Sequence, residues 1–250
     1  MKIFGLIAVL VVGALLLSAT SDFPDWRDKD SPANKSPVSS FYIEKTEKLT
    51  KVPNMVTAVL ADYRGYDTMF ETVVIFIAGI GIIAVLRNFD GPNSSSIKRE
   101  NNDEGGGLLA RFTCSLILPF IQIFALYVVA HGHHSPGGGF QGGVMLGASY
   151  ILAALAFGLS KAKDIFSERR TMIFAAVGIF IYVGWGVLCL LFGKEFLNYE
   201  ALDSILPGDA KMARSHSMLI VEIGVAFTVT AIMFSMYSNL STRGRLSKGL

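Results

Sequence analysis

The sequence predicts an all-α integral membrane protein that crosses the bilayer about six times. Of its 250 residues, 52% are hydrophobic and only 17% are charged, and the apolar residues are gathered in blocks. A bilayer core about 30 Å thick requires roughly 20 apolar residues per helix. Six stretches meet this requirement, approximately residues 3–19, 69–87, 108–130, 140–159, 171–193 and 217–238. A membrane β-barrel would instead require alternating polarity over about ten residues, which the sequence does not show.

The first stretch admits two interpretations. Lys2, the apolar run and the small residues Ser18 and Ala19 also describe a secretory signal peptide. We favour a membrane anchor, because Leu17 at the third position before the candidate cleavage site matches the usual small-residue pattern poorly.

A long polar segment, from about residue 20 to residue 68, follows the first stretch. Residues 22–32 are turn-prone and nearly balanced in charge, which predicts an extended strap on a neighbouring protein, with disorder as the alternative. Apolar residues between positions 41 and 60 are sufficient for an interfacial helix or a docked partner contact.

Basic residues near the ends of the spans predict that both termini are cytoplasmic. One side of the membrane receives Lys2, the basic loops at 87–111 and 161–170, and the basic C-terminal tail. The opposite side receives no Lys or Arg at 131–139 and three at 194–216. The polar segment at 20–68 carries seven basic and eight acidic residues, and segments of that length influence orientation weakly.

The distribution of these features predicts two modules. Residues 89–107 contain runs of serine and glycine that are typical of a flexible linker. We therefore divide the chain into a two-helix module with an outer strap at 1–88, a flexible cytoplasmic linker at 89–107, a four-helix module at 108–240 and a basic cytoplasmic tail at 241–250.

The most informative segment is HGHHSPGGGFQGG, residues 131–143, which lies between the third and fourth spans. Pro136 restricts the backbone, and Gly137, Gly138 and Gly139 allow conformations denied to other residues. The chain can therefore leave one span and enter the next within a few residues, and we call residues 131–139 the glycine turn.

Glycines within the spans predict close approach between helices, and hence a protein surrounded by the helices of other chains in a larger complex. They are Gly143 and Gly147 in the fourth span, Gly178, Gly184 and Gly186 in the fifth, and Gly79 and Gly81 in the second.

Two acidic residues, Glu71 and Glu222, lie within stretches of membrane-spanning length. A charged acid near the centre of a span costs about 2.5 to 3.5 kcal/mol on insertion scales, so such residues usually face protein or a wet cavity. A protonated glutamic acid lowers this cost, and readiness to exchange a proton is what a proton relay requires. The alternative is that each side chain lies near a span end and simply reaches headgroup water.

All four histidines, His131, His133, His134 and His216, lie on one side of the membrane in the predicted topology. An imidazole can take up or release a proton at ordinary pH and could pass it toward Glu222. Structural polar packing, a proton or ion pathway and a metal site all remain open. No HExxH helix or nearby cysteine supports a metal, and none of the four lies inside a span as an axial haem ligand would.

Catalysis, cofactors and nucleic acid have no support in the sequence. Cys114 and Cys189 lie inside predicted spans and belong to no CxxC pair, so neither a disulfide nor an iron-sulfur cluster is expected. The net charge of +2 offers no basic face for nucleic acid. No Ser-His-Asp, Walker or Rossmann arrangement occurs in context, and we predict no catalytic residue, cofactor or metal.

The HGHHSPGGGFQGG segment and the VMLGASYILAALAFG that follows it closely resemble the MnhB-like B-type component of the multisubunit Mrp-type sodium/proton antiporters, and the related component of membrane-bound hydrogenases. DYRGYDTMFETVV, at 62–74, resembles the C-terminal end of the large A-type component of the same antiporters, or the corresponding small hydrogenase component. The chain thus resembles a fusion of two normally adjacent small components, over about three quarters of its length.

The resemblance implies a non-enzymatic multi-pass subunit of the cytoplasmic membrane that couples sodium and proton movement. It implies other Mrp-type subunits as partners, including large antiporter-like ones, and leaves open a stand-alone antiporter or one attached to a redox arm with iron-sulfur proteins. Glu71, Glu222 and the four histidines are the candidate pathway residues, Asp67 and Asp203 are fainter cation-attracting candidates, and Phe140 and Gln141 belong to the matching turn. The alternatives are a purely structural or assembly role and an outward-facing metal-binding protein.

Overall fold

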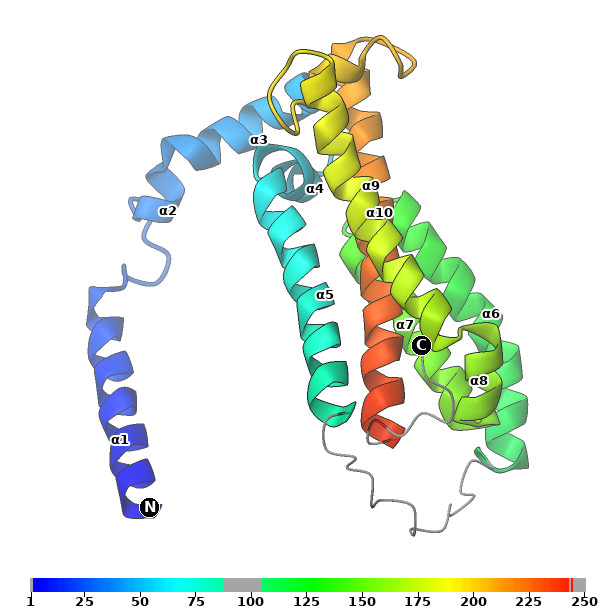
Figure 1. Cartoon of the computed structure of the whole chain (residues 1–250). Coiled ribbons are helices and arrows are strands. Elements are labelled where there is room, and N and C mark those ends of the chain that lie inside the picture. Colours follow the sequence, from blue (N-terminus) through cyan, green and yellow to red (C-terminus); the bar gives the residue numbers. More distant parts are fainter. Residues whose placement is uncertain (1, 88–104, 243, 245–250) are drawn as a thin grey trace. The chain divides into compact units, whose positions relative to one another are not determined.

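A computed structural model describes residues 2–87, 105–242 and 244 (Figure 1). The described residues are predominantly helical and contain no strand. They divide into two compact units, Met1–Glu44 and Lys45–Leu250, which we call the first and second units.

The first unit contains α1 (Lys2–Ala19), the short 3-10 helix η1 (Thr20–Asp22), α2 (Pro32–Lys35) and the beginning of α3 (Pro37–Thr50). Between Asp22 and Pro32 the chain forms bends and turns, and the Trp26 side chain is almost fully exposed. The stretch Ile3–Asp22 is long and apolar enough to cross a membrane.

The second unit holds the end of α3 and the remaining elements. These are α4 (Met55–Ala58), the π-helical turn η2 (Val59–Tyr63), α5 (Gly65–Arg87), α6 (Leu108–Ala130), α7 (Gly139–Phe157), α8 (Leu159–Ile165), α9 (Glu168–Leu191), the 3-10 helix η3 (Tyr199–Leu202) and α10 (Ala210–Thr242).

Six of the described helices are long and apolar enough to span a bilayer, namely α1, α5, α6, α7, α9 and α10. The predicted all-α fold with six spans is therefore confirmed. The sixth predicted span, about residues 217–238, lies within α10, and the helix itself begins seven residues earlier, at Ala210. Lys211 and Arg214 lie in its first turns and lower the hydropathy there, so this part of the helix does not belong to the apolar stretch.

Helix α10 lies at the centre of the second unit and packs against α5, α7 and α9, while α6 packs against α7. In the most apolar stretch of α10, 67% of the residues are buried, against 17% in the corresponding stretches of α5 and α6. A helix enclosed on several sides can carry polar side chains that lipid would not accept. This central position is what brings Glu222 of α10 into the interior.

Small residues permit the close packing around α10. A Cβ atom at Gly178 would overlap the Gly224 carbonyl oxygen of α10, and one at Gly79 would lie 2.9 Å from the Ile232 side chain. A Cβ atom at Gly184 or Gly81 would meet nothing within 4 Å in the described part of this chain, so their predicted close contacts with helices of other chains stay a prediction. Their sides of the helices carry no neighbour from the described part of this chain.

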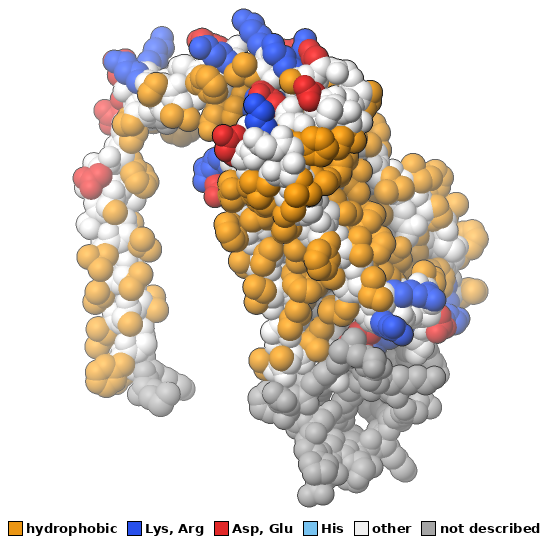
Figure 2. All heavy atoms as spheres, turned by 45° about the horizontal axis from the view of Figure 1, so that its top comes forward, with side chains coloured by type: hydrophobic (Ala, Val, Ile, Leu, Met, Phe, Trp, Pro, Cys, Tyr) orange, Lys and Arg blue, Asp and Glu red, His pale blue; other side chains and the backbone are white. Residues whose placement is uncertain are grey.

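The visible surface of the second unit separates apolar from charged side chains (Figure 2). Apolar side chains cover the middle of the helices, and charged side chains gather at the two ends, a distribution that suits a bilayer. The exposed apolar face of α6 includes Phe112, Leu116, Phe120 and Phe124.

The predicted linker falls mostly outside the described residues, since only Gly105–Gly107 of it is described. The Gly106 N–H donates to the carbonyl oxygens of Leu155 and Ala156, each at 3.0 Å, at the end of α7. The predicted tail at 241–250 begins inside α10, and its remaining residues except Gly244 also lie outside the described residues.

Candidate functional site

The glycine turn joins α6 to α7 and lies directly against Glu222 of α10. A Cβ atom at Gly139 would overlap the Glu222 carbonyl oxygen. A Cβ at Gly138 would lie 2.9 Å from Glu222 Oε1, and one at Gly132 would lie 3.1 Å from Oε2. Gly138 also has a positive φ of 122°, which side chains disfavour. The glycines thus provide both the backbone conformation of the turn and the space for the Glu222 carboxyl group.

Asn54 and Thr57, from the segment before α5, hold the other side of the glycine turn. Asn54 Nδ2 donates to the carbonyl oxygens of Gly132 at 2.7 Å and Ser135 at 2.8 Å. The Asn54 N–H donates to the His133 carbonyl oxygen at 2.9 Å, and Thr57 Oγ1 donates to the Gly132 carbonyl oxygen at 2.7 Å.

Sequence reasoning did not identify Asn54 or Thr57 as site residues. The available signal was local: Asn54 is the N-cap of α4, where its side chain accepts a hydrogen bond from the Val56 N–H. That signal predicts the start of a helix but not its distant contact with the glycine turn.

A cavity of about 250 Å³ lies between the segment before α5, α5, the start of α7, α9 and α10. Both predicted in-span acids line it, and so do Phe140 and Gln141 of the matching motif. We call it the carboxylate cavity. Its lining comprises Val56, Thr57, Leu60, Ala61, Thr68, Glu71, Thr72, Gly137, Gly139, Phe140, Gln141, Tyr182, Val221, Glu222 and Val225.

The two carboxylates occupy different positions in this cavity. Glu222 is partly buried, and its Oε2 atom is enclosed without a hydrogen-bond partner among the described residues. Glu71 is exposed on α5, six residues after the first residue of that helix. No described residue forms an ion pair or hydrogen bond with the Glu71 carboxylate. The cavity thus contains one inner and one outer acid, both available to a proton or cation.

The four histidines lie at the end of the second unit that carries the glycine turn. The His131 ring stacks on Tyr127 with centroids 4.8 Å apart and lies 5.5 Å from the His134 ring. The pKa of His133 is lowered, mainly by burial and further by the positive charges of His134 and His216. No histidine lines the carboxylate cavity, although the backbone of their turn encloses Glu222. Among the described residues, no three His, Cys, Asp or Glu side chains are placed to hold a metal ion.

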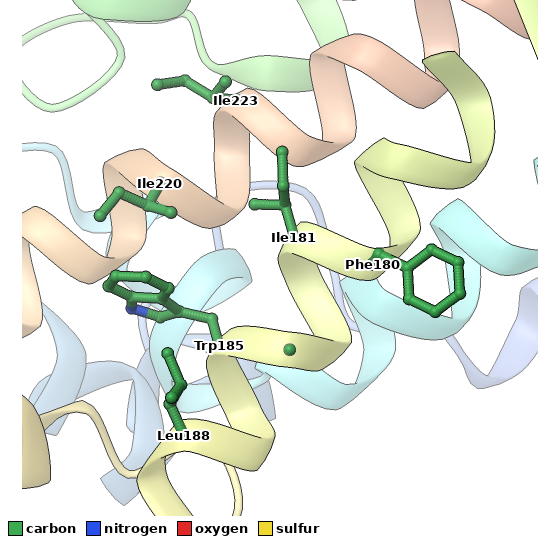
Figure 3. A pocket seen from close by; sticks show the side chains of 7 residues that line it. Phe180, Ile181, Trp185, Leu188, Ile220 and Ile223 are labelled. Atoms are coloured by element: carbon green, nitrogen blue, oxygen red, sulfur yellow. The ribbon is translucent and has the colours of Figure 1, made fainter. Parts of the chain in front are cut away.

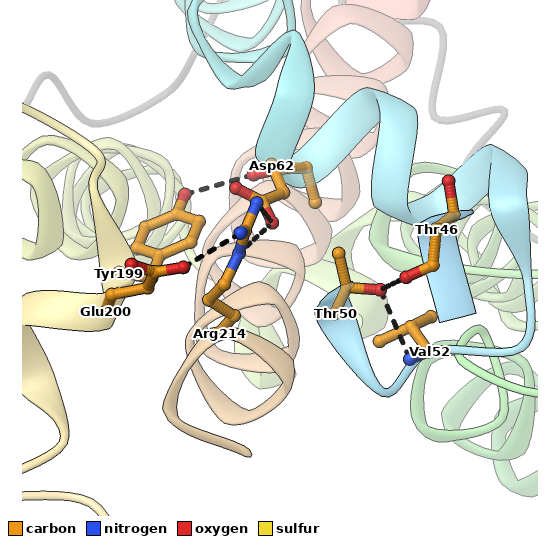
Figure 4. A network of polar contacts seen from close by, with 8 residues as sticks. Thr46, Thr50, Val52, Asp62, Tyr199, Glu200 and Arg214 are labelled. Carbon is orange, nitrogen blue, oxygen red and sulfur yellow. Dashed lines mark hydrogen bonds and ion pairs between the residues drawn. The ribbon is translucent and has the colours of Figure 1, made fainter. Parts of the chain in front are cut away.

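An ion-pair network lies beside this site (Figure 4). Arg214 of α10 contacts Asp62 Oδ2 through both Nε and Nη2, each at 2.7 Å, and Glu200 Oε1 through Nη1 at 3.0 Å. Burial raises the pKa of Asp62, and the neighbouring Arg214 opposes that rise. Tyr199 donates its hydroxyl to the Ala61 carbonyl oxygen at 3.1 Å. The network ties the segment before α5 to η3 and α10.

The fainter acidic candidates lie outside the cavity. Asp67 is exposed and pairs with Arg64, and Asp203 is exposed in the turn after η3. Sequence reasoning overlooked Asp62 as a structural residue, because its partner Arg214 is 152 positions away.

A second, apolar groove of about 480 Å³ lies on the outer side of α9 and α10 (Figure 3). It is lined by Phe180, Ile181, Gly184, Trp185, Leu188, Ile220 and Ile223. None of these lining side chains is titratable, so the groove suits apolar packing and not proton or ion chemistry.

The fold and the site together define a class: a multi-pass membrane protein with a carboxylate-lined cavity at one end of its helices. Residues 109–235, about half of the chain, match the family described as "Domain related to MnhB subunit of Na+/H+ antiporter". The chain therefore belongs to this family. Residues 29–104 match a second family, described as the E-type subunit of MBH. The resemblances read from residues 62–74 and 131–158 are thus confirmed.

Individual relatives agree with this assignment. The chain is 25% identical over 206 residues to a protein of Rhizobium meliloti (strain 1021) that is named as the probable A/B subunit of a K(+)/H(+) antiporter. This match covers 75% of the chain but only 20% of that longer protein. The "Putative antiporter subunit mnhB2" of Staphylococcus aureus (strain Newman) is 28% identical over 136 residues, which cover 54% of the chain and 94% of the relative.

Two solved structures resemble the whole chain. A chain of the membrane-bound sulfane sulfur reductase, described as an archaeal respiratory membrane complex, superposes with a TM-score of 0.69 at 25% identity. The superposition covers 96% of this chain and 97% of that one. A chain of the Mrp complex from Dietzia sp. DQ12-45-1b gives a TM-score of 0.70 at 22% identity, covering 99% of this chain and 26% of that one, a likeness that shows the fold alone.

Proposed function

We propose that the chain is a non-enzymatic membrane subunit of a cation/proton antiporter module, and that the carboxylate cavity forms part of the ion or proton path. The observation that carries this proposal is that Glu71 and Glu222, from two different spans, line one cavity beneath the glycine turn. Membership in the MnhB-related family supports the transport role.

In this proposal Glu222 is the inner proton carrier. A carboxylic acid enclosed at membrane depth and free of an ion-pair partner can be held protonated and can release its proton when a cation or another base approaches. The glycine turn leaves room for its carboxyl group, and Asn54 and Thr57 keep that turn in place.

Glu71 and the polar lining receive the ion at the mouth of the cavity. Thr68, Thr72 and Gln141 line the same cavity as Glu71 and add hydroxyl and amide oxygens to it. Such oxygen atoms suit alkali cations, which are hard ions with oxygen ligands, as well as water. In this proposal the histidines at the same end of the unit belong to the outer part of the path.

The test is transport by the intact complex that carries Glu222→Gln, which keeps the size of the side chain and removes its titratable proton. We expect cation-driven proton movement in vesicles to fall by about ten-fold or more, because a proton carrier is lost. The matched control is Glu47→Gln, which changes an exposed acid outside the cavity and should leave transport unchanged.

The competing function is a purely structural or assembly role. If Glu222→Gln abolishes recovery of the complex, Glu222 serves assembly. If complex and transport both survive, the path proposal is wrong. Transport lost from an intact complex supports the path.

We further propose that this module is attached to a redox arm with iron-sulfur proteins. The supporting observation is that the sulfane sulfur reductase chain and this chain match over almost their full lengths. Gentle purification from native membranes, with identification of all co-purifying polypeptides by mass spectrometry, tests this. Iron-sulfur proteins beside large antiporter-like subunits are the expected result, whereas antiporter-like subunits alone would indicate a stand-alone exchanger.

A further inference from the structure

Helix α5 lies at the edge of the helices of the second unit (Figure 1), and some of the side chains that line the carboxylate cavity are exposed; we call this exposed part of the lining the mouth of the cavity. Glu71 and Gln141 are both exposed there. The rim around them is apolar and also exposed, and it consists of Val56, Leu60 and Phe140 of the cavity lining together with Phe70 and Val74 of α5. A polar centre is thus surrounded by an apolar border.

This surface does not suit the acyl chains of lipids. Glu71 lies within a membrane-spanning helix, its carboxylate has no partner among the described residues, and hydrocarbon cannot solvate a charge. The outer face of α6 offers a contrast, because its exposed side chains include Phe112, Leu116, Phe120 and Phe124 and no acid. The α6 face can therefore contact lipid, whereas the Glu71 face requires a polar neighbour.

We propose that a membrane helix of another subunit docks over this mouth and presents a lysine or arginine side chain to Glu71. Charge complementarity selects the basic residue, since a carboxylate at this depth is stabilised by a cation with hydrogen-bond donors. The apolar rim packs against the flanking residues of the same helix. This inference rests on the proposed function, because it names the partner that completes the wall of the proposed path beside Glu71.

The experiment places a photo-crosslinking amino acid at Val74 in the native complex. Val74 lies three positions after Glu71 and hence on the same side of α5, and its side chain is exposed. The matched control is the same probe at Phe120 on the outer face of α6. Mass spectrometry then identifies the cross-linked peptides and any lipid adducts.

We expect the Val74 probe to label one transmembrane segment of one other subunit, with a Lys or Arg within one helical turn of the labelled residue. The Phe120 probe should label lipid. Lipid adducts alone at Val74, or a labelled segment without a basic residue, would overturn the proposal.

A charge exchange provides the second measurement. Glu71→Lys should lower recovery of the intact complex by about ten-fold or more, because like charges would then face each other. Changing the labelled basic residue of the partner to Glu should restore recovery, and failure to restore it would contradict the ion pair. These readouts do not involve transport, so docking and the ion path can fail independently.

Discussion

The acidic residues of the second unit differ in what surrounds their carboxyl groups. Asp62 is almost buried, with 8% of its side chain exposed, and makes two contacts at 2.7 Å with Arg214. A buried ion pair of this kind offsets its desolvation cost only with such close geometry. The role of Asp62 is therefore structural, because its ion pair connects the segment before α5 to α10. The enclosed oxygen of Glu222 has no partner among the described residues, which leaves it available for exchange.

At the residue scale, His133→Gln should reduce the sensitivity of the complex to acid. The pKa of His133 is lowered from its usual value of 6.5 by burial and then by His134 and His216. The folded chain consequently binds fewer protons than the unfolded chain as pH falls through that value, so stability decreases.

The measurement is the thermal unfolding midpoint of the purified complex at about pH 7.5 and about pH 5.5. The wild type should lose more stability than His133→Gln between these conditions. His131→Gln, in the same turn, is the control. Equal losses for the wild type and His133→Gln would show that His133 does not contribute.

Small residues determine how closely the elements approach α10. Gly178 of α9 lies against the Gly224 carbonyl oxygen and Thr228 of α10, and Thr228 Oγ1 donates to the Ala175 carbonyl oxygen at 3.0 Å. In the membrane, where water does not drive helices together, such close contacts and interhelical hydrogen bonds hold the bundle. The position of Glu222 in the cavity depends on this packing.

At the element scale, Gly178→Ala should destabilise the second unit, because its Cβ would overlap the backbone of α10. We expect a loss of about 1 to 3 kcal/mol, as for other overpacked sites. Gly184→Ala on the same helix is the matched control, since its Cβ meets nothing within 4 Å. Denaturant unfolding of the purified complex measures both, and indistinguishable midpoints would contradict the packing argument.

At the scale of the whole molecule, the second unit interlocks segments that are far apart in the sequence. The segment before α5 contacts the glycine turn through Asn54, η3 through Tyr199, and α10 through the Asp62–Arg214 pair. All three contacts lie at the end of the unit that carries the glycine turn. The helices and the loops at this end therefore form one connected polar layer above the cavity.

The predicted orientation places that polar layer on the outer side of the membrane, with both termini in the cytoplasm. Single cysteines at Asp203 and Lys161, introduced after replacement of Cys114 and Cys189, test this. Both Asp203 and Lys161 are exposed. An impermeant maleimide should label the first position in intact cells and the second only after permeabilisation. The reverse pattern would invert the topology.

The sequence by itself determined the six spans, the two in-span acids and the glycine turn. Each is visible locally, because a bilayer demands long apolar runs and makes any acid within them conspicuous. Gly137, Gly138 and Gly139 are equally visible, since backbone freedom belongs to the residue itself.

Only the tertiary structure decided which of these residues meet. Glu71 and Glu222 share a cavity, Asn54 binds the glycine turn and Asp62 pairs with Arg214 because helices from both halves of the sequence pack around α10. The same dependence explains Gly184 and Gly81, which are small but face no neighbour among the described residues. These contacts depend on how surfaces from distant parts of the sequence pack together, and the composition of a short segment does not determine that packing.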